Sequence, residues 1–241
     1  MVNNIFKRGF ESVENMKQEQ QASKGNGIYD FYVKDKEDAL MRFLTDEPIA
    51  FKAHTIKVGK APRVFVCTED ENCLGCKQPD SFDMSKPNKA SVKAAFLVLD
   101  GREVERDEKI DGQPTGKKVK YTDQIKVMVR GVTDVANIQM QKQKYGLLNR
   151  TFTCSKRGIK NPYTFDRNDD CPQGKDPKFW SNGALSEEAI NELIEKLPEK
   201  YREIAKGEDG FYGVLYELFK PYGFDNSVGN EVEEPTALTR C

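Results

Sequence analysis

Histidine and tryptophan are scarce in this sequence, with one residue of each among 241. The lone histidine, His54, leaves little material for general acid–base catalysis, which relies on histidine more than on any other side chain. The sequence also lacks a Walker loop, a G-x-S-x-G nucleophile motif and an H-E-x-x-H metalloprotease motif. We therefore expect a protein without enzymatic activity.

Long apolar runs are missing as well. No stretch of about 18 consecutive apolar residues occurs, so the sequence predicts no membrane-spanning helix and no membrane partner. Residues 1–21 lack the apolar centre of a secretory signal. We therefore expect a cytoplasmic protein, in a reducing compartment where clustered cysteines serve metal binding or catalysis more often than disulfides.

The charge is nearly balanced overall but unevenly distributed. Residues 185–241 carry 13 acidic and 6 basic side chains, whereas the other 26 acidic and 32 basic side chains lie in residues 1–184. A basic body with an acidic end is typical of proteins that bind polyanions. The alternative interpretation is that the acidic end only improves solubility.

Four potential metal ligands lie in one short segment, with the spacing His54-x12-Cys67-x5-Cys73-x2-Cys76. Two residues between cysteines, one of them glycine, allow both sulfurs to face one point, as in tetrahedral zinc sites. One imidazole and three thiolates complete the coordination shell, so we predict a single structural zinc ion. A redox-active Cys73–Cys76 pair and a Cys–His nucleophile remain as alternatives.

Hydrophobic periodicity predicts a mainly β, α+β protein with helices at its C-terminal end. The helical pattern follows an N-cap at Ser186 and breaks at Pro198. The charged segment 103–118 is predicted to be a loop. A small OB-type barrel fits the succession of short strands, and a sandwich is the alternative. Strands are expected at 28–33, 50–58, 63–67, 91–101, 119–131, 149–158 and 161–167, and a helix at 134–146.

The changes in composition along the chain predict four parts. Residues 1–27 are expected to form a polar N-terminal arm, and residues 28–180 an OB-fold-like core with a zinc-binding subdomain at about 51–77. Residues 181–224 form a predicted helical C-terminal region, and residues 225–241 an acidic tail.

Several segments carry a resemblance to a known family. The order "ALMRFLTDE…FKAHTIKV…VFVCTEDENCLGCK" resembles the single-stranded DNA-binding proteins of tailed bacteriophages, of the T-even helix-destabilising type. The segments "VKYTDQIKVMVRGVTDVANIQM" and "GLLNRTFTCSKRGIKNPYTFD" resemble that family's basic strand and closing hairpin. The resemblance covers roughly residues 28–180.

The resemblance implies an OB-fold core with an inserted zinc subdomain. It implies cooperative, non-specific binding of single-stranded DNA in phage replication, recombination and repair, in the cytoplasm of the host cell. It also implies self-association through the N-terminal arm and contacts with replication and recombination proteins through the C-terminal region.

Binding of an unpaired strand requires cations that follow the phosphates and aromatic faces on which bases stack. Basic and aromatic side chains alternate over the predicted strands, whereas Trp180 is predicted to be either a lid over the groove or an anchor between domains. The predicted DNA-binding residues are Arg42, Lys52, Lys57, Arg63, Lys120, Tyr121, Lys126, Arg130, Arg150, Lys156, Arg157, Lys160 and Tyr163.

Two other functions remain as alternatives. The first is a zinc-stabilised regulatory or adaptor protein that binds duplex DNA or a polymerase. The second is a structural protein of the virion, which would assemble alone.

Overall fold

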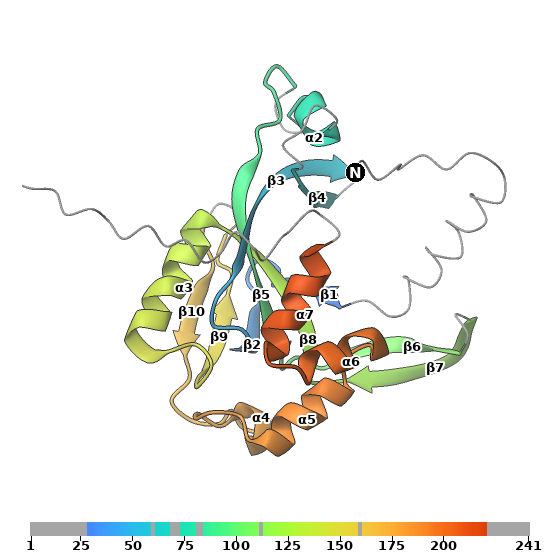
Figure 1. The fold of residues 1–241 in the computed structure, drawn as a ribbon, viewed down its shortest axis with the longest axis vertical. Coiled ribbons are helices and arrows are strands. Elements are labelled where there is room, and N and C mark those ends of the chain that lie inside the picture. Colours follow the sequence, from blue (N-terminus) through green and yellow to red (C-terminus); the bar gives the residue numbers. More distant parts are fainter. Residues whose placement is uncertain are drawn as a thin grey trace, which may run out of the picture.

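The computed structural model describes residues 28–58, 61–67, 73–80, 84–110, 113–158 and 161–220. The predicted arm and acidic tail lie outside these ranges. The described part is a mixed α+β structure with an eight-stranded sheet, a separate two-stranded hairpin and six helices (Figure 1). No helix among the described residues has both the length and the apolar character needed to cross a membrane.

Eight short strands form the main sheet. Their hydrogen-bonded order is β1-β8-β5-β2-β9-β10, and β3 pairs with both β4 and β5. All pairs are antiparallel except the short parallel pair of β1 with β8. The strands are β1 (Tyr29–Asp30), β2 (Asp38–Phe43), β3 (Ile49–Val58), β4 (Ala61–Val66), β5 (Ser91–Asp100), β8 (Gln124–Gly131), β9 (Thr151–Ser155) and β10 (Thr164–Arg167).

The strands β2 and β3 lie one after the other along the same edge of β5. The first pairs with the C-terminal end of β5 and the second with its N-terminal end. The bend between them is held by two hydrogen bonds, from Leu44 N to the Leu97 carbonyl (2.9 Å) and from Leu97 N to Thr45 Oγ1 (3.1 Å). This bend lets β3 extend beyond the sheet and carry the β3–β4 hairpin.

The predicted barrel is confirmed only as a sheet-rich α+β core. Within the described ranges no hydrogen-bonded ladder joins β1 to β10, the strands at the two ends of this order, so the sheet does not close on itself there. Along the chain, β5 and β8 are followed by α3 (Val132–Tyr145) and then by the β9–β10 hairpin.

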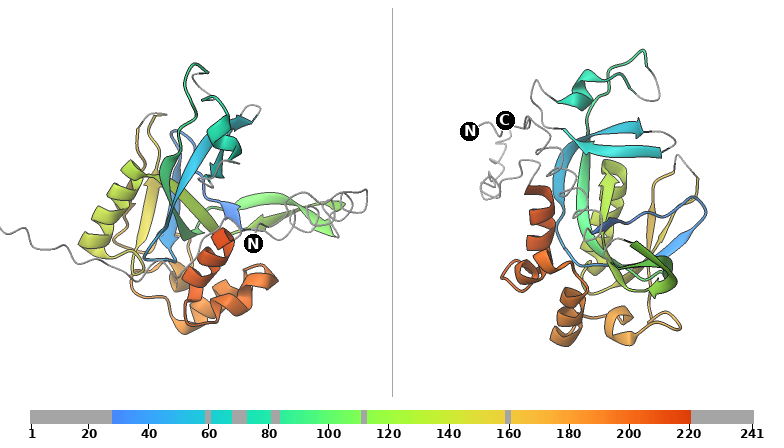
Figure 2. Two further views of the ribbon diagram at one scale, coloured as in Figure 1. Left: turned by 45° about the horizontal axis from the view of Figure 1, so that its top comes forward. Right: turned by 90° about the vertical axis from the view of Figure 1, so that its right-hand side faces the viewer.

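Side chains alternate between two hydrophobic cores on opposite faces of the sheet. Ala94, Phe96 and Val98 of β5 face one core, whereas Ala95 and Leu97 face the other. Period-two alternation of this kind is what a strand buried on both faces requires. The first core is closed by α3, and the second by the C-terminal helices, as Figures 1 and 2 show.

The C-terminal helices are part of the core rather than a detached region. They are α4 (Pro177–Trp180), α5 (Glu187–Glu195), α6 (Glu199–Ala205) and α7 (Gly210–Phe219). The Phe219 ring lies 5.0 Å from that of Phe51 on β3. The predicted cap is confirmed, since Ser186 Oγ accepts a hydrogen bond from Ala189 N, and the predicted break at Pro198 separates α5 from α6.

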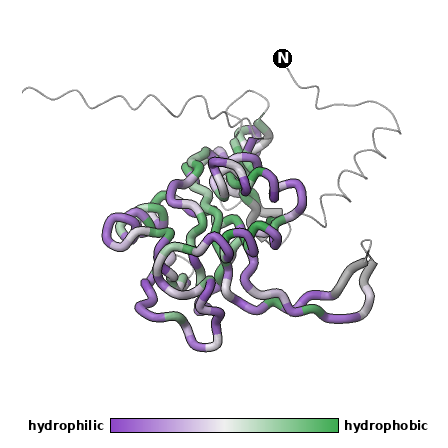
Figure 3. Tube along the Cα trace, turned by 60° about the horizontal axis from the view of Figure 1, so that its bottom comes forward, coloured by the Kyte–Doolittle hydropathy of each residue, from purple (hydrophilic) through white to green (hydrophobic). Residues whose placement is uncertain are grey.

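The segment predicted to be a charged loop is instead a long β-hairpin. Its strands, β6 (Val104–Ile110) and β7 (Gln113–Tyr121), project from the body and are mostly hydrophilic (Figures 1 and 3). The strand predicted over 119–131 is interrupted by Asp123, whose positive φ of 53° ends β7 and redirects the chain into β8. Cross-strand pairing of opposite charges stabilises this hairpin without an apolar pattern.

Candidate metal centre and nucleic-acid interface

The structure gathers all four predicted metal ligands at one point. Their ligand atoms lie within 4.8 Å of one another. The Cys67 sulfur is 3.7 Å from the sulfurs of Cys73 and Cys76, and His54 Nε2 is 3.5 and 3.4 Å from those same two sulfurs. His54, Cys67 and Cys73 are buried, whereas Cys76 is exposed. The cluster is therefore able to hold a metal ion.

Two structural elements bring the ligands together. His54 lies on β3 and Cys67 follows β4, so the hairpin supplies two of them. Cys73 is the N-cap of the single turn of α2 (Leu74–Lys77), and Cys76 lies within that turn. Lys77 N donates a hydrogen bond to the Cys73 carbonyl. The turn packs against the imidazole: a Cβ atom built on Gly75 would lie 2.2 Å from His54 Cδ2.

The electrostatics of the cluster favour a bound cation. Hydrogen bonds with the thiols of Cys73 and Cys67 raise the pKa of the Cys76 thiol to about 12. The Cys76 thiol therefore stays protonated at neutral pH unless a cation lies close to it. A metal ion removes this penalty, because its positive charge stabilises the thiolates as it binds them.

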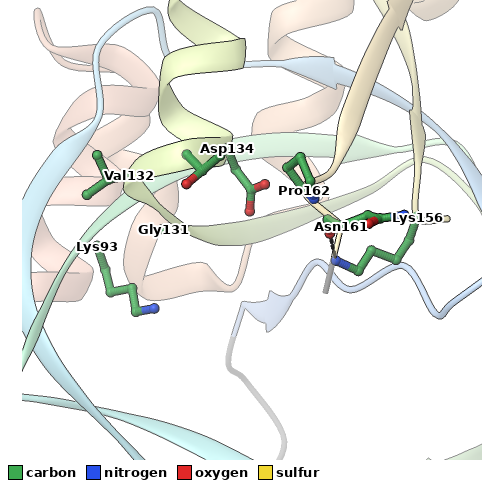
Figure 4. A pocket seen from close by; sticks show the side chains of 8 residues that line it. Lys93, Gly131, Val132, Asp134, Lys156, Asn161 and Pro162 are labelled. Carbon is green, nitrogen blue, oxygen red and sulfur yellow. Dashed lines mark hydrogen bonds between the residues drawn. The ribbon is translucent and has the colours of Figure 1, made fainter. Parts of the chain in front are cut away.

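A polar hollow of about 300 Å³ lies at the other end of β5 and β8 from the β6–β7 hairpin. Lys93 of β5 and Lys156 of the β9–β10 connection lie on two sides of it, and the first turn of α3 forms a third (Figure 4). Lys156 Nζ donates to the Asn161 carbonyl, which also lines the hollow. The residues that line it are Lys93, Gly131, Val132, Thr133, Asp134, Lys156, Asn161 and Pro162.

An aromatic ring beside the hollow contacts two cations. The Tyr163 ring lies 4.0 Å from the guanidinium carbon of Arg130 and 4.6 Å from Lys156 Nζ. Its hydroxyl donates to the Val33 carbonyl (3.2 Å), and its backbone N–H donates to Asp134 Oδ1 (2.8 Å). Tyr163 is thus a half-buried ring in a fixed position, with its polar groups already satisfied.

No protein-family model matches this sequence, and no curated protein matches it significantly.

The predicted DNA-binding residues fall into several groups in the structure. Arg130 and Lys156 both contact the Tyr163 ring beside the hollow, but of these only Lys156 lines it. Arg130 itself is 7% exposed and donates to the carbonyls of Val129 and Phe31. Lys52 is exposed on β3, and Arg150 is half-buried at the start of β9. The side chains of Lys57 and Arg63 and the whole of Lys160 lie outside the described part of the chain.

Three of the predicted contacts are tied to carboxylates or lie far from the hollow. Arg157 is exposed and forms a two-pronged ion pair with Asp38 (2.6 and 2.8 Å). Lys120 and Tyr121 lie at the end of β7, and Lys120 Nζ pairs with Glu103 at 2.8 Å. These residues do not belong to the hollow.

Two predicted DNA contacts require correction. Arg42 is 1% exposed, and its guanidinium donates to the carbonyls of Leu148, Phe179, Ser181 and Gly183. Lys126 is 6% exposed and pairs with Asp100. Their charged groups are bonded to partners inside the protein, so neither residue is a DNA contact.

Asp100 is buried and pairs with both Arg102 and Lys126. Burial by itself raises its pKa, but hydrogen bonds and charge attraction from Arg102 and Lys126 outweigh that effect and lower the pKa below the ordinary 3.8. A depressed carboxyl pKa contributes stability that is present above the unfolded value and is lost as the pH falls through the folded one.

We expect Asp100→Asn to lower the free energy of unfolding at neutral pH, because it leaves Lys126 buried without a carboxylate. The difference from wild type should shrink as the pH falls below about 4, where the wild-type carboxylate takes up its proton. Urea denaturation at several pH values measures this. A difference that stays constant down to pH of about 2 would show that Asp100 is not ionised in the fold.

Two residues that line the hollow, Lys93 and Asn161, were not predicted from the sequence. Lys93 directly precedes the apolar run of β5, so its position at a strand end was a usable signal. Nothing local marks Asn161, because only the pairing of β9 with β10 brings its loop to the start of α3.

Proposed function

We propose that this protein binds single-stranded DNA without sequence specificity, on an OB-fold-like core stabilised by one structural zinc ion. The order of elements supports the OB-like interpretation: bent β2–β3, β5 and β8 are followed by a helix and a final hairpin, and β2 pairs with both β5 and β9. Such a core is a common support for unpaired strands. The resemblance to phage single-strand-binding proteins points the same way.

Bond lengths support zinc as the ion. Zinc binds thiolate sulfur at about 2.3 Å and imidazole nitrogen at about 2.0–2.1 Å, so a regular tetrahedron has S···S edges of about 3.8 Å and S···N edges of about 3.5 Å. Four of the six edges between the ligand atoms are 3.7 Å for sulfur to sulfur and 3.4–3.5 Å for sulfur to nitrogen, and all six are within 4.8 Å. Four protein ligands leave no open position for water, so the ion's role is structural.

The observation that carries the proposal is the polar hollow with its adjoining ring. Lys93 reaches it from β5 and Lys156 from the β9–β10 connection, and both offer positive charge to phosphates, while Tyr163 offers an aromatic face at its rim. An unpaired strand presents phosphates and free base faces together, which a duplex does not. The pairing of charge with an aromatic face favours a single strand over duplex DNA.

The proposal assigns the protein a role in organising and protecting DNA during replication, recombination and repair, with no catalytic step. Partner proteins would meet the C-terminal region, and self-association would use the N-terminal arm. Both remain proposals from the resemblance.

Titration with oligothymidylate tests the proposal. We expect salt-sensitive binding, with affinity for the single strand well above that for a duplex of equal length. Each phosphate neutralised on a single strand contributes about 0.7 to the slope of log affinity against log salt. Lys93→Ala and Lys156→Ala should each weaken binding and reduce that slope by about 0.7.

A matched control is Lys200→Ala. Lys200 is exposed on α6, among the C-terminal helices, and stacks on Tyr201 at 4.6 Å. It should change neither affinity nor slope. Preference for the duplex, or indifference to both DNAs, would reject the proposal in favour of an adaptor or a virion protein.

A further inference from the structure

Two tyrosines and an arginine form a stack at the base of the β6–β7 hairpin. The guanidinium carbon of Arg106 lies 4.2 Å from the centre of the Tyr29 ring and 5.9 Å from that of Tyr121. Arg106 Nη2 also donates to Gln124 Oε1 at 3.3 Å. The two rings remain 49% and 39% exposed. Arg106 therefore fixes their position without covering them.

The two faces of the hairpin differ in chemistry. Arg106 is directly opposite Val119, and Tyr121 opposite Val104, so these four side chains share one face. Glu105 and Lys120, which are directly opposite each other, lie on the other face.

On that second face the charges neutralise each other. Lys118 pairs with Glu105 at 3.6 Å, and Lys120 pairs with Glu103 at 2.8 Å. The hydrogen bond to Glu103 raises the pKa of Lys120. The face with Arg106 has no such pairing among its described side chains, so it presents an aromatic surface with a cation.

The aromatic face continues towards the hollow. Tyr29 is paired with Lys126 on β8, five residues from Gly131 at the hollow, which corresponds to roughly 17 Å along a strand. Tyr32, 60% exposed, lies between Phe31, whose N–H donates to the Val127 carbonyl of β8, and Val33, whose carbonyl accepts from the Tyr163 hydroxyl beside the hollow.

We propose that Tyr29 and Tyr121, held by Arg106, form a second base-stacking site, and that the bound strand runs from the hollow past Tyr32 to the base of the hairpin. This inference rests on the proposed single-strand binding and adds the path of the strand. The site takes unpaired nucleobases, because exposed rings beside an arginine stack planar aromatic groups. It has no preference among bases, since every base has such a face.

The test compares double variants at the two tyrosines. Tyr29→Leu with Tyr121→Leu keeps apolar bulk but removes both rings, and Tyr29→Phe with Tyr121→Phe keeps the rings. Stacking on one ring contributes roughly 5- to 150-fold in affinity. We expect the leucine pair to weaken binding of a labelled oligothymidylate of about 12 nucleotides at least roughly tenfold, and the phenylalanine pair to bind like wild type.

Two further ligands separate stacking from a structural effect. An oligothymidylate of about 4 nucleotides spans only the hollow, and an abasic sugar–phosphate chain of about 12 units has no bases. The leucine pair should bind both as wild type does. The matched control is Tyr145→Leu, since Tyr145 lies between Arg167 (4.4 Å) and Lys144 (4.9 Å) at the far end of α3.

The outcomes distinguish this inference from the proposed function. If wild type does not bind oligothymidylate, the proposed function fails. If wild type binds and the Lys93 and Lys156 variants weaken binding, but the leucine pair matches wild type, only the second stacking site is rejected. An equal loss on the abasic chain would also reject it, because no base is present to stack.

Discussion

Gly75→Ala is expected to abolish stoichiometric metal binding. The new methyl group would lie 2.2 Å from Cδ2 and 2.4 Å from Cγ of the His54 imidazole, well inside contact distance. The imidazole cannot move aside and still coordinate, so the substitution removes one ligand without touching any of the four. Because even residues outside the ligand set affect metal affinity by about 10- to 100-fold, the loss of a ligand should exceed 100-fold.

Metal analysis of the purified variant and competition with a chromogenic chelator measure this effect. Lys77→Ala is the matched control, because Lys77 occupies the same helical turn with an exposed side chain. It should retain one metal ion per chain. A Gly75→Ala protein with one tightly held ion would contradict the arrangement of His54 against this turn.

Arg42→Met is expected to destabilise the whole fold. The buried guanidinium donates to carbonyls at Leu148, Phe179 and Ser181 at 2.8–3.1 Å, and also to Gly183. Methionine fills similar space but donates nothing, so buried carbonyls lose their partners. With about 1–3 kcal/mol for each unsatisfied group, we expect the free energy of unfolding to fall by about 3–5 kcal/mol.

Urea denaturation followed by tryptophan fluorescence measures this loss. Trp180 is fully buried, directly follows Phe179, and donates from Nε1 to Asp123 at 2.8 Å, so it reports on this junction. Arg157→Met is the control: its exposed ion pair with Asp38 should contribute no more than about 1 kcal/mol. Equal stability of the Arg42 and Arg157 variants would show that the buried hydrogen bonds contribute little.

The sequence predicted the metal cluster well because its geometry is local. Cys73 and Cys76 share one turn, and His54 and Cys67 sit on the two arms of one hairpin. The strands β3, β5, β8 and β9 were predictable for a similar reason, since the signal lies within each segment: a near-continuous apolar run in β5 and short strand-like patterns in the other three. Trp180 is an anchor and not a lid, which its type alone did not decide.

The failures concern properties that sequence spacing does not encode. Arg42 and Lys126 are residue types that often contact phosphates. In the fold, however, the Arg42 side chain reaches the Phe179 carbonyl and the Lys126 side chain reaches Asp100. Residues 103–118 lack an apolar pattern because charge pairing across the two strands replaces burial. Lys93 joins Lys156 only through the pairing of distant strands.

The long strand β3 connects the cluster of metal ligands with the strand position beside the hollow. His54 belongs to the cluster. Three residues earlier on the same strand, Phe51 pairs with Lys93, which lines the hollow. A single strand therefore spans both places. If occupancy of the cluster stiffens that strand and thereby raises the affinity of the hollow for DNA, reciprocity requires that an occupied hollow strengthen retention of the ion by the same factor.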